Sequence, residues 1–196
     1  MPAISNHDTP RTSVLYVGRF APAKKVSLLI EGFAKAAERM PEMRLILVGG
    51  GEEESRLREL ASHLGVASKV EFPGWIDDLD QLLPFYRRSF CSASPGFAGL
   101  GLTQSLGFGI PMLVADNEPH SPEIELDISG GVEYFASDSP DGLRDALLHK
   151  WDSRDILPDH DLSEYTRVRY SAEAMAAGLR DAFENRVPSI SNRGAL

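Results

Sequence analysis

Short runs of apolar residues alternate along this chain with longer segments in which apolar residues recur every three or four positions. The short runs end at glycine or polar residues, as residues 13–17 and 43–48 do, which is typical of buried strands. In the longer segments, such as residues 24–40, the apolar residues have the spacing of one helix face. Strands that alternate with helices in this way predict an α/β fold with a doubly wound parallel sheet of the Rossmann-like kind.

The same pattern divides the chain into one folded domain and two ends. Residues 1–12 are polar and rich in turn formers, so we expect a disordered lead-in or linker there, followed by a domain over residues 13–185 and a flexible tail over residues 186–196. The predicted strands are residues 13–17, 43–48, 69–72, 89–93, 111–115 and 133–135. The predicted helices are residues 24–40, 52–64, 79–88, 100–108, 141–151 and 171–185.

Composition and net charge restrict the classes of protein to which this chain can belong. With 196 residues, of which 42% are hydrophobic, the chain fits one globular domain at about 150 residues per domain. Its 29 acidic and 20 basic residues give a net charge of −9, which repels nucleic acid and anionic membrane surfaces but allows a local basic pocket. We therefore expect no nucleic-acid partner.

Cysteine content and the N-terminal sequence favour the cytoplasm. Cys91 is the one cysteine of the sequence, so neither a disulfide nor a cysteine-based zinc site can form within the chain. No apolar run approaches the roughly 18 residues that span a membrane, and the N-terminus lacks the basic and apolar regions of a signal peptide. We expect a cytoplasmic protein without a transmembrane helix.

Ligands of doubly wound sheets bind beyond the carboxyl ends of the strands, so the loops that follow the predicted strands are the places to look for chemistry. The loop after the first strand carries Arg19 and Lys24. Arginine can form paired hydrogen bonds with phosphate oxygens, and lysine adds a mobile positive charge. A solvated basic loop would contain the same residues, and spacing alone leaves both interpretations open.

Two further loops carry candidate ligand contacts. Gly96, Gly99 and Gly101 lead into a helix start, where small residues let a ligand approach free amides, and where tight helix–sheet packing would also select glycine. After the fifth strand, His120 could contact a substrate or simply lie at the surface. Glu123 could accept hydrogen bonds from sugar or ribose hydroxyls, or cap the helix that follows.

Two phosphate-binding motifs are absent or incomplete. The sequence has no G-x-x-x-x-G-K-[ST] P-loop, and the glycine triplet at residues 49–51 is followed by Glu54 where a dinucleotide fingerprint needs its last glycine. The triplet therefore predicts a structural turn that leads into a helix with an acidic first turn.

Two Asp-x-Asp pairs could suggest metal ligands. Asp78 and Asp80 are better explained as the cap and the first-turn carboxylate of a helix. Asp159 and Asp161 lie in what we expect to be a proline-flanked loop. Neither pair has further ligands nearby in the sequence, so we predict no metal site.

Five short segments follow one another in a specific order. They are Val17-Gly18-Arg19 with Lys24, residues 45–52, residues 70–76, Gly109-Ile110-Pro111 with Pro122-Glu123, and Tyr170-Ser171. Each is a weak signal, but their order and spacing over residues 13–183 resemble the C-terminal, donor-binding domain of the retaining GT-B glycosyltransferases, of the group 1, family 4-like type.

The resemblance implies a reaction and a set of site residues. The reaction is transfer of a hexose-like unit from a nucleotide-sugar (NDP-sugar) to a saccharide or lipid-linked acceptor in polysaccharide or glycoconjugate synthesis, with no metal and no further cofactor. Arg19 and Lys24 would be the catalytic residues, because they would neutralise the leaving diphosphate. The substrate-binding residues that it implies are Gly18, Gly74, Trp75, Ile76, Gly99, Leu100, Gly101, Gln104, His120 and Glu123.

The chain departs from this family at two positions. The family carries two glutamates eight positions apart, the first near the transferred sugar and the second on the ribose; Gly96 and Gln104 stand there in this chain. Gln104 can still hydrogen-bond a ribose hydroxyl, whereas Gly96 offers no side chain. The departure need not abolish activity, since a branch of polysaccharide-synthesis transferases has a similar pattern.

The resemblance also implies a partner. Enzymes of the family have an N-terminal acceptor-binding domain, so this chain corresponds either to a domain of a longer enzyme or to a half that works with another chain, with peripheral membrane association through that half or a homodimer as further expectations. Two alternatives stay open. One is a catalytically inactive module for assembly or regulation, and the other is an NDP-sugar epimerase-like protein in which His120 would serve as an acid–base group.

Overall fold

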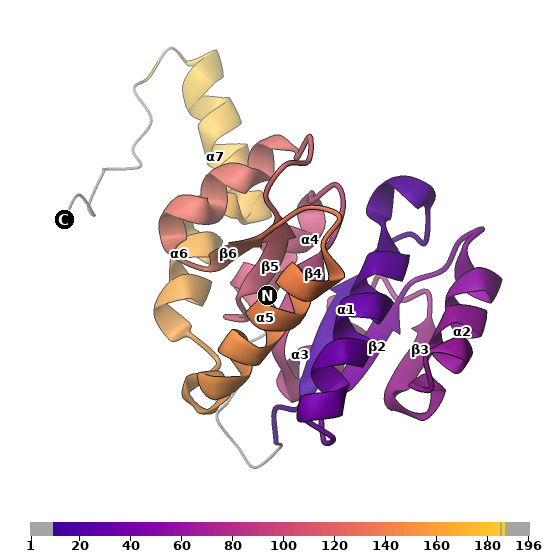
Figure 1. Ribbon diagram of the computed structural model, residues 1–196. Coiled ribbons are helices and arrows are strands. Elements are labelled where there is room, and N and C mark those ends of the chain that lie inside the picture. The colour runs from indigo at the N-terminus through magenta and orange to yellow at the C-terminus, as the bar shows by residue number, and fades with distance from the viewer. Residues whose placement is uncertain (1–9, 185, 187–196) are drawn as a thin grey trace.

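The computed structural model describes residues 10–184 and residue 186. Six parallel strands form one sheet in the order β3-β2-β1-β4-β5-β6 (Figure 1). This confirms the predicted parallel α/β sheet. The strands are β1 (Ser13–Val17), β2 (Arg44–Val48), β3 (Val70–Gly74), β4 (Ser89–Ser94), β5 (Met112–Ala115) and β6 (Val132–Phe135).

Helices connect successive strands and cover both faces of the sheet. The α-helices are α1 (Val26–Arg39), α2 (Glu54–His63), α3 (Leu79–Arg88), α4 (Leu100–Gly107), α5 (Pro140–Asp152), α6 (His160–Tyr170) and α7 (Ala172–Phe183). Short 3-10 segments are η1 (Pro22–Lys24), η2 (Ala67–Lys69), η3 (Pro122–Ser129) and η4 (Arg154–Ile156). Helices α1 and α5 lie side by side on the face turned toward the viewer in Figure 1.

The core lies on both faces of the sheet because successive strand residues point to opposite sides. In β1, Val14 and Tyr16 pack into the cluster beneath α1 and α5, while Leu15 packs into the cluster beneath α3. In that second cluster the ring of Tyr86 stacks on the ring of Phe108. Strands buried on both faces explain why the sequence shows continuous apolar runs rather than alternation.

The first helix begins later than predicted. Residues 22–24 form the 3-10 segment η1, and Lys25 adopts a left-handed conformation with φ of 48°, so α1 starts at Val26 instead of residue 24. The Lys25 ammonium group forms ion pairs with Glu118 and, at 2.8 Å, with Asp138. Lysine rarely adopts this backbone conformation.

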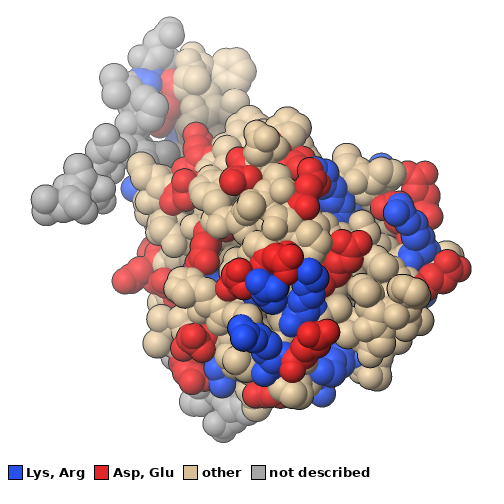
Figure 2. Space-filling model, in the orientation of Figure 1, with Lys and Arg blue, Asp and Glu red and all other residues tan. Residues whose placement is uncertain are grey.

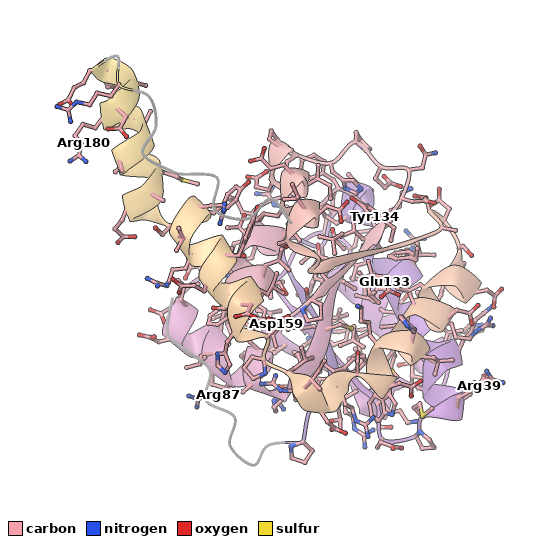
Figure 3. The ribbon with its side chains drawn as sticks, turned by 90° about the vertical axis from the view of Figure 1, so that its left-hand side faces the viewer. Arg39, Arg87, Glu133, Tyr134, Asp159 and Arg180 are labelled. Atoms are coloured by element: carbon pink, nitrogen blue, oxygen red, sulfur yellow. The ribbon has the colours of Figure 1, made fainter. Side chains whose placement is uncertain are left out.

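Helix α6 was not predicted, and the expectation of a loop around Asp159 and Asp161 is wrong. The Asp159 carboxylate accepts a hydrogen bond from the Leu162 backbone N–H at 2.9 Å and caps the helix, whose beginning is visible in Figure 3. Only Leu162 and Thr166 are buried, four positions apart. Because one of these two buried residues is polar, the helix has no clear apolar stripe in the sequence.

The last helix stands away from the sheet at the top of Figure 1. It runs from Ala172 to Phe183, with Ser171 as its cap, and Met175, Leu179 and Phe183 are exposed at spacings of four residues. Residue 185 and residues 187–196 lie outside the described residues, as do residues 1–9. The predicted lead-in, domain limits and tail therefore stay predictions.

Acidic and basic side chains are interleaved on the face formed by α1 and α5, as Figure 2 shows. Asp141 of α5, for example, pairs with Lys35 of α1 at 2.8 Å and with Arg144 at 2.5 Å. Exposed pairs of this kind contribute about 0–1 kcal/mol each. Among the helices of the described residues, none is both long and apolar enough to cross a membrane.

Candidate functional site

A crevice opens at the carboxyl ends of β1 and β4, where the strand order changes direction. Its larger part is a cavity of about 560 Å³, and an adjoining cavity of about 330 Å³ lies toward β2 and β3. The two share the lining residues Val17, Gly18, Trp75, Leu100 and Gly101. Such a switch point is where doubly wound sheets bind ligands.

Arg19 reaches the larger cavity from the loop after β1. Its side chain is exposed, and within residues 10–184 it forms no ion pair. The hydroxyl of the buried Tyr16 donates to the Arg19 carbonyl at 2.9 Å and so stabilises the backbone of the loop after β1. The guanidinium group is therefore available for an anionic ligand while its backbone is fixed.

Lys24 lines the larger cavity together with the first turn of α4. Its ammonium group donates to the Phe97 carbonyl at 2.8 Å and lies 4.4 Å from the centre of the Phe97 ring. Partial burial lowers the pKa of Lys24 from its ordinary value. Lys24 thus joins the loop after β1 to the loop after β4, whereas the neighbouring Lys25 points away to Glu118 and Asp138.

The first turn of α4 faces the same cavity. Gly99 is the cap residue and makes no side-chain capping bond, and Gly99, Leu100 and Gly101 all line the cavity. The first N–H groups of a helix have no partner within it, and the helix dipole places partial positive charge there. Together with Arg19 and Lys24, this end of the helix makes the crevice favourable for an anion.

Gly96 explains one departure from the family. A Cβ atom at this position would stand 2.2 Å from the Ala23 carbonyl oxygen, and the Phe97 N–H donates to the same oxygen at 3.3 Å. A glutamate side chain therefore cannot occupy this place unless the loop after β1 moves. The sequence showed the missing carboxylate but could not show that the space for it is filled by backbone.

Gln104, Trp75 and Ile76 lie together in the smaller cavity. The indole of Trp75 is 62% exposed and borders both cavities. The Gln104 Oε1 atom accepts a hydrogen bond from the buried Tyr86 hydroxyl at 3.1 Å. Gly74 lines neither cavity; its carbonyl accepts from the Gly49 N–H at 2.9 Å, which fixes the backbone just before Trp75.

Glu123 lines the larger cavity, whereas His120 lies outside it. Both ring nitrogens of His120 are bonded to backbone: Nδ1 accepts from the Ala98 N–H at 3.2 Å, and Nε2 lies 2.7 Å from the Ala115 carbonyl oxygen. His120 does not line the cavity, so its geometry supports a role in holding the α4 loop rather than direct substrate contact. Glu123 lines the cavity, and its carboxylate accepts a hydrogen bond from the Ser121 hydroxyl.

The glycine triplet is a structural turn, as predicted. A Cβ at Gly49 would stand 1.8 Å from the Gly18 carbonyl oxygen, so two loop backbones pack directly on each other there. Glu54 opens α2 and pairs with Arg58 at 2.8 Å. Asp78 caps α3 by accepting from two backbone N–H groups, as predicted.

Within the described part of the chain, no group of three or more His, Cys, Asp and Glu side chains is arranged to hold a metal ion. The charged side chains that line the crevice are Arg19, Lys24 and Glu123 in the larger cavity and Asp77 in the smaller one. The two cations and the α4 helix start favour an anionic group in the larger cavity. The adjoining cavity, with Trp75 and Gln104, suits a flat group with polar edges.

The fold is that of a doubly wound α/β protein with a crevice at the switch point of its sheet. The chain belongs to the glycosyl transferases group 1 family, whose model matches residues 1–169. It is 33% identical over 138 residues to the lipopolysaccharide core biosynthesis glycosyltransferase LpsE of Rhizobium meliloti (strain 1021). That match covers 69% of this chain and 36% of LpsE, so the chain spans about a third of this relative's length.

Solved structures show the same fold, that of the GT-B C-terminal half. Sucrose-phosphate synthase from Thermosynechococcus elongatus matches with a TM-score of 0.75 and 21% identity over 93% of this chain and 46% of that protein. Anabaena Alr3699/HepE in complex with UDP matches with a TM-score of 0.74 and 17% identity over 89% of this chain and 49% of that protein.

Proposed function

We propose that this chain is the donor-binding half of a retaining glycosyltransferase that transfers a hexose-like unit from an NDP-sugar to a saccharide or lipid-linked acceptor in polysaccharide or glycoconjugate synthesis. The observation that carries the proposal is the convergence of Arg19, Lys24 and the first turn of α4 on one crevice in a chain of net charge −9. Positive charge concentrated there, against the overall sign, favours a diphosphate.

The shape of the crevice supports an orientation for the donor. The diphosphate would lie between Arg19, Lys24 and the N–H groups of Leu100 and Gly101. The base would lie in the smaller cavity against Trp75, with the ribose near Gln104, and the sugar would extend toward Phe97, Ser121 and Glu123.

This orientation assigns a chemical role to the two cations. When the bond between the anomeric carbon and the diphosphate oxygen breaks, its electron pair stays on the diphosphate. Arg19 and Lys24 would stabilise that growing negative charge, and we assign this task to them rather than to a metal ion. Fixed donors aimed at developing charge are an effective form of catalysis because they need no rearrangement during the reaction.

The acceptor is proposed to bind a second domain. The chain spans 36% of LpsE, and we propose that an N-terminal GT-B domain, in the same or another chain, covers the crevice, excludes water and orients the acceptor. The exposed Trp75 and Leu100 at the crevice mouth and the apolar stripe on α7 support a missing partner surface. We further propose a cytoplasmic location, with any membrane association through that domain; dimerisation through the same surface is the alternative.

Calorimetric titration tests the donor site. We expect one of UDP, GDP, ADP and dTDP to bind saturably, and Arg19→Ala to weaken that binding by about 1.5–3 kcal/mol, the contribution of a hydrogen bond to a charged group. Lys35→Ala is the matched control, because Lys35 is a partly exposed cation of α1 that lies outside the crevice. An affinity that Arg19→Ala leaves unchanged would contradict the assignment.

The absence of a side chain at Gly96 favours a second candidate, a transferase-like module that does not catalyse transfer. Such a module would bind a nucleoside diphosphate without turnover even when the acceptor domain is supplied, or would bind none at millimolar concentration, which is weaker than about −4 kcal/mol. The epimerase-like alternative is disfavoured, because both ring nitrogens of its candidate acid–base group, His120, are bonded to backbone.

A further inference from the structure

We propose that the buried Tyr86 is a positioning residue that turns the Gln104 amide so that its N–H groups face the crevice, which makes the site select a ligand with a hydrogen-bond acceptor there, namely a ribose hydroxyl oxygen. The proposal rests on the proposed function for the identity of the ligand. The arrangement of the two side chains is independent of it.

Tyr86 cannot easily move away from Gln104. The tyrosine is 1% exposed in the second core cluster, where Leu82 of the same helix and Ile110 also pack, and it borders the larger cavity from below the surface. Its ring stacks on the ring of Phe108 with the ring centres 4.3 Å apart and the planes 25° from parallel. Close packing on this ring restricts its rotation, so the hydroxyl stays directed at one point.

The direction of the hydrogen bond follows from the chemistry of the two groups. Burial raises the pKa of Tyr86 far above its ordinary value, so the hydroxyl keeps its proton. A buried O–H needs an acceptor, and the Gln104 Oε1 atom lies 3.1 Å from it. Since an amide has one oxygen and one NH₂ group, the oxygen turned toward Tyr86 leaves the two N–H donors for the other side.

The other side of Gln104 is the crevice. Gln104 is partly exposed on α4 and lines the smaller cavity with Trp75 and Ile76. A carboxylate here would present acceptors, to which a ligand hydroxyl would donate. The fixed amide presents donors instead, so the hydroxyl oxygen itself must accept, and a ligand that lacks this oxygen loses the bond.

Titrations of four proteins test the coupling. Wild type, Tyr86→Phe, Gln104→Ala and the double variant are each titrated with the best-binding nucleoside diphosphate of the four above and with its 2′-deoxy and 3′-deoxy forms. We expect wild type to bind at least one deoxy form about 3- to 10-fold more weakly than the ribonucleotide, and Tyr86→Phe to lose most of this discrimination. In the Gln104→Ala background, Tyr86→Phe should change nothing further.

A merely structural role for Tyr86 gives a different result. Tyr86→Phe would then weaken the ribose and deoxy ligands equally, and would do so in the Gln104→Ala background too, which would overturn the proposal. Tyr170→Phe is the matched control, since it removes a hydroxyl that is bonded to Glu125, and neither residue lines the crevice.

A second measurement separates this inference from the proposed function. The side-chain amide of Gln104 gives its own ¹⁵N–¹H signals in the protein without ligand. We expect Tyr86→Phe to shift these signals and to speed their exchange with water, with the backbone signals of α4 unchanged. If no diphosphate binds wild type, the ligand assignment fails with the proposed function, whereas unshifted Gln104 signals would overturn the positioning role by themselves.

Discussion

Gly96 packs directly on the backbone of Ala23: a Cβ atom on Gly96 would lie 2.2 Å from the Ala23 carbonyl oxygen and 2.9 Å from the Lys24 carbonyl carbon. The loop after β4 and the loop after β1 are therefore one packed unit. Lys24 strengthens this unit through its bond to the Phe97 carbonyl. The position of Lys24 in the crevice thus depends on the absence of a side chain at residue 96.

Gly96→Ala tests this dependence. The added methyl group must displace the Ala23–Lys24 backbone, so we expect a loss of about 1–3 kcal/mol in the free energy of unfolding and weaker diphosphate binding. Gly96→Glu should behave no better, although it supplies the glutamate of the family. Denaturant unfolding and calorimetric titration measure the two effects.

The matched control for this substitution is Gly178→Ala. A Cβ at Gly178 of α7 meets no atom within 4 Å, and alanine is favoured over glycine in a helix by up to about 1 kcal/mol. We expect this variant to be as stable as wild type or more so. Equal stability and affinity of Gly96→Ala and wild type would show that the two loops are free to separate.

The lowered pKa of Lys24 predicts a pH dependence of binding. Burial brings this pKa below its ordinary value of 10.5, so the ammonium group loses its proton earlier than an exposed lysine as the pH rises. We expect diphosphate affinity to fall in alkaline solution, at a lower pH than an exposed lysine would give, and Lys24→Arg, which stays charged, to remove most of that fall. Titrations at several pH values provide the measurement; the same profile for both proteins would assign the titration to another group.

The lowered pKa of Lys24 also makes the free energy of unfolding depend on pH. Because the folded-state pKa of Lys24 lies below the unfolded value, the unfolded chain binds more protons in the window between the two. The contribution of this group to the free energy of unfolding therefore rises with pH across that window. Lys24→Met should flatten the stability profile there in denaturant unfolding, and Lys35→Met, which removes a lysine outside the crevice, is the control.

Trp75 should report ligand binding by its fluorescence. It is 62% exposed at the crevice, whereas the other tryptophan of the sequence, Trp151, is buried with its ring 5.3 Å from that of Phe90. A base that stacks on the Trp75 indole would change its emission and leave Trp151 unaffected. We expect the change to disappear in Trp75→Phe and to persist in Trp151→Phe; a response that survives in Trp75→Phe would contradict this location for the base.

The cap of α6 contributes to stability without contact to the crevice. Asp159→Ala removes the acceptor of the Leu162 N–H, and we expect a loss of about 0.5–2 kcal/mol in the free energy of unfolding with unchanged diphosphate affinity. Asp161→Ala is the control, because this carboxylate lies in the first turn of α6 but is not its cap. Equal effects of the two substitutions would mean that charge rather than capping matters.

Much of the fold could be predicted because the inner strands β1, β2, β4 and β5 are buried on both faces. Continuous apolar runs such as Ser13–Val17 identify them without reference to any other part of the chain. Helix α3 was predicted with its limits, since Asp78 caps it and a strand follows directly. Helix α6 was missed because its two buried residues are Leu162 and Thr166, of which one is polar, while Tyr165 and Tyr170 are only partly buried against the core.

The site could be predicted in outline but not in its contacts. Strand order and loop position alone place Arg19 and Lys24 near α4. The partners of the Lys25 side chain, by contrast, are Glu118 and Asp138, which lie far away in the sequence. Likewise, the two backbone partners of His120, Ala98 and Ala115, come from two different loops, and no local pattern reveals them.

The left-handed turn at Lys25 makes the length of its loop as important as its charge. Lys24 and Lys25 are adjacent and chemically identical, yet one points to the crevice and the other to two carboxylates. Inserting or deleting a single residue before them would place a different residue at each of these two positions, although both lysines would still be present. In any redesign of this segment, the number of residues between β1 and α1 is therefore the parameter that must be kept.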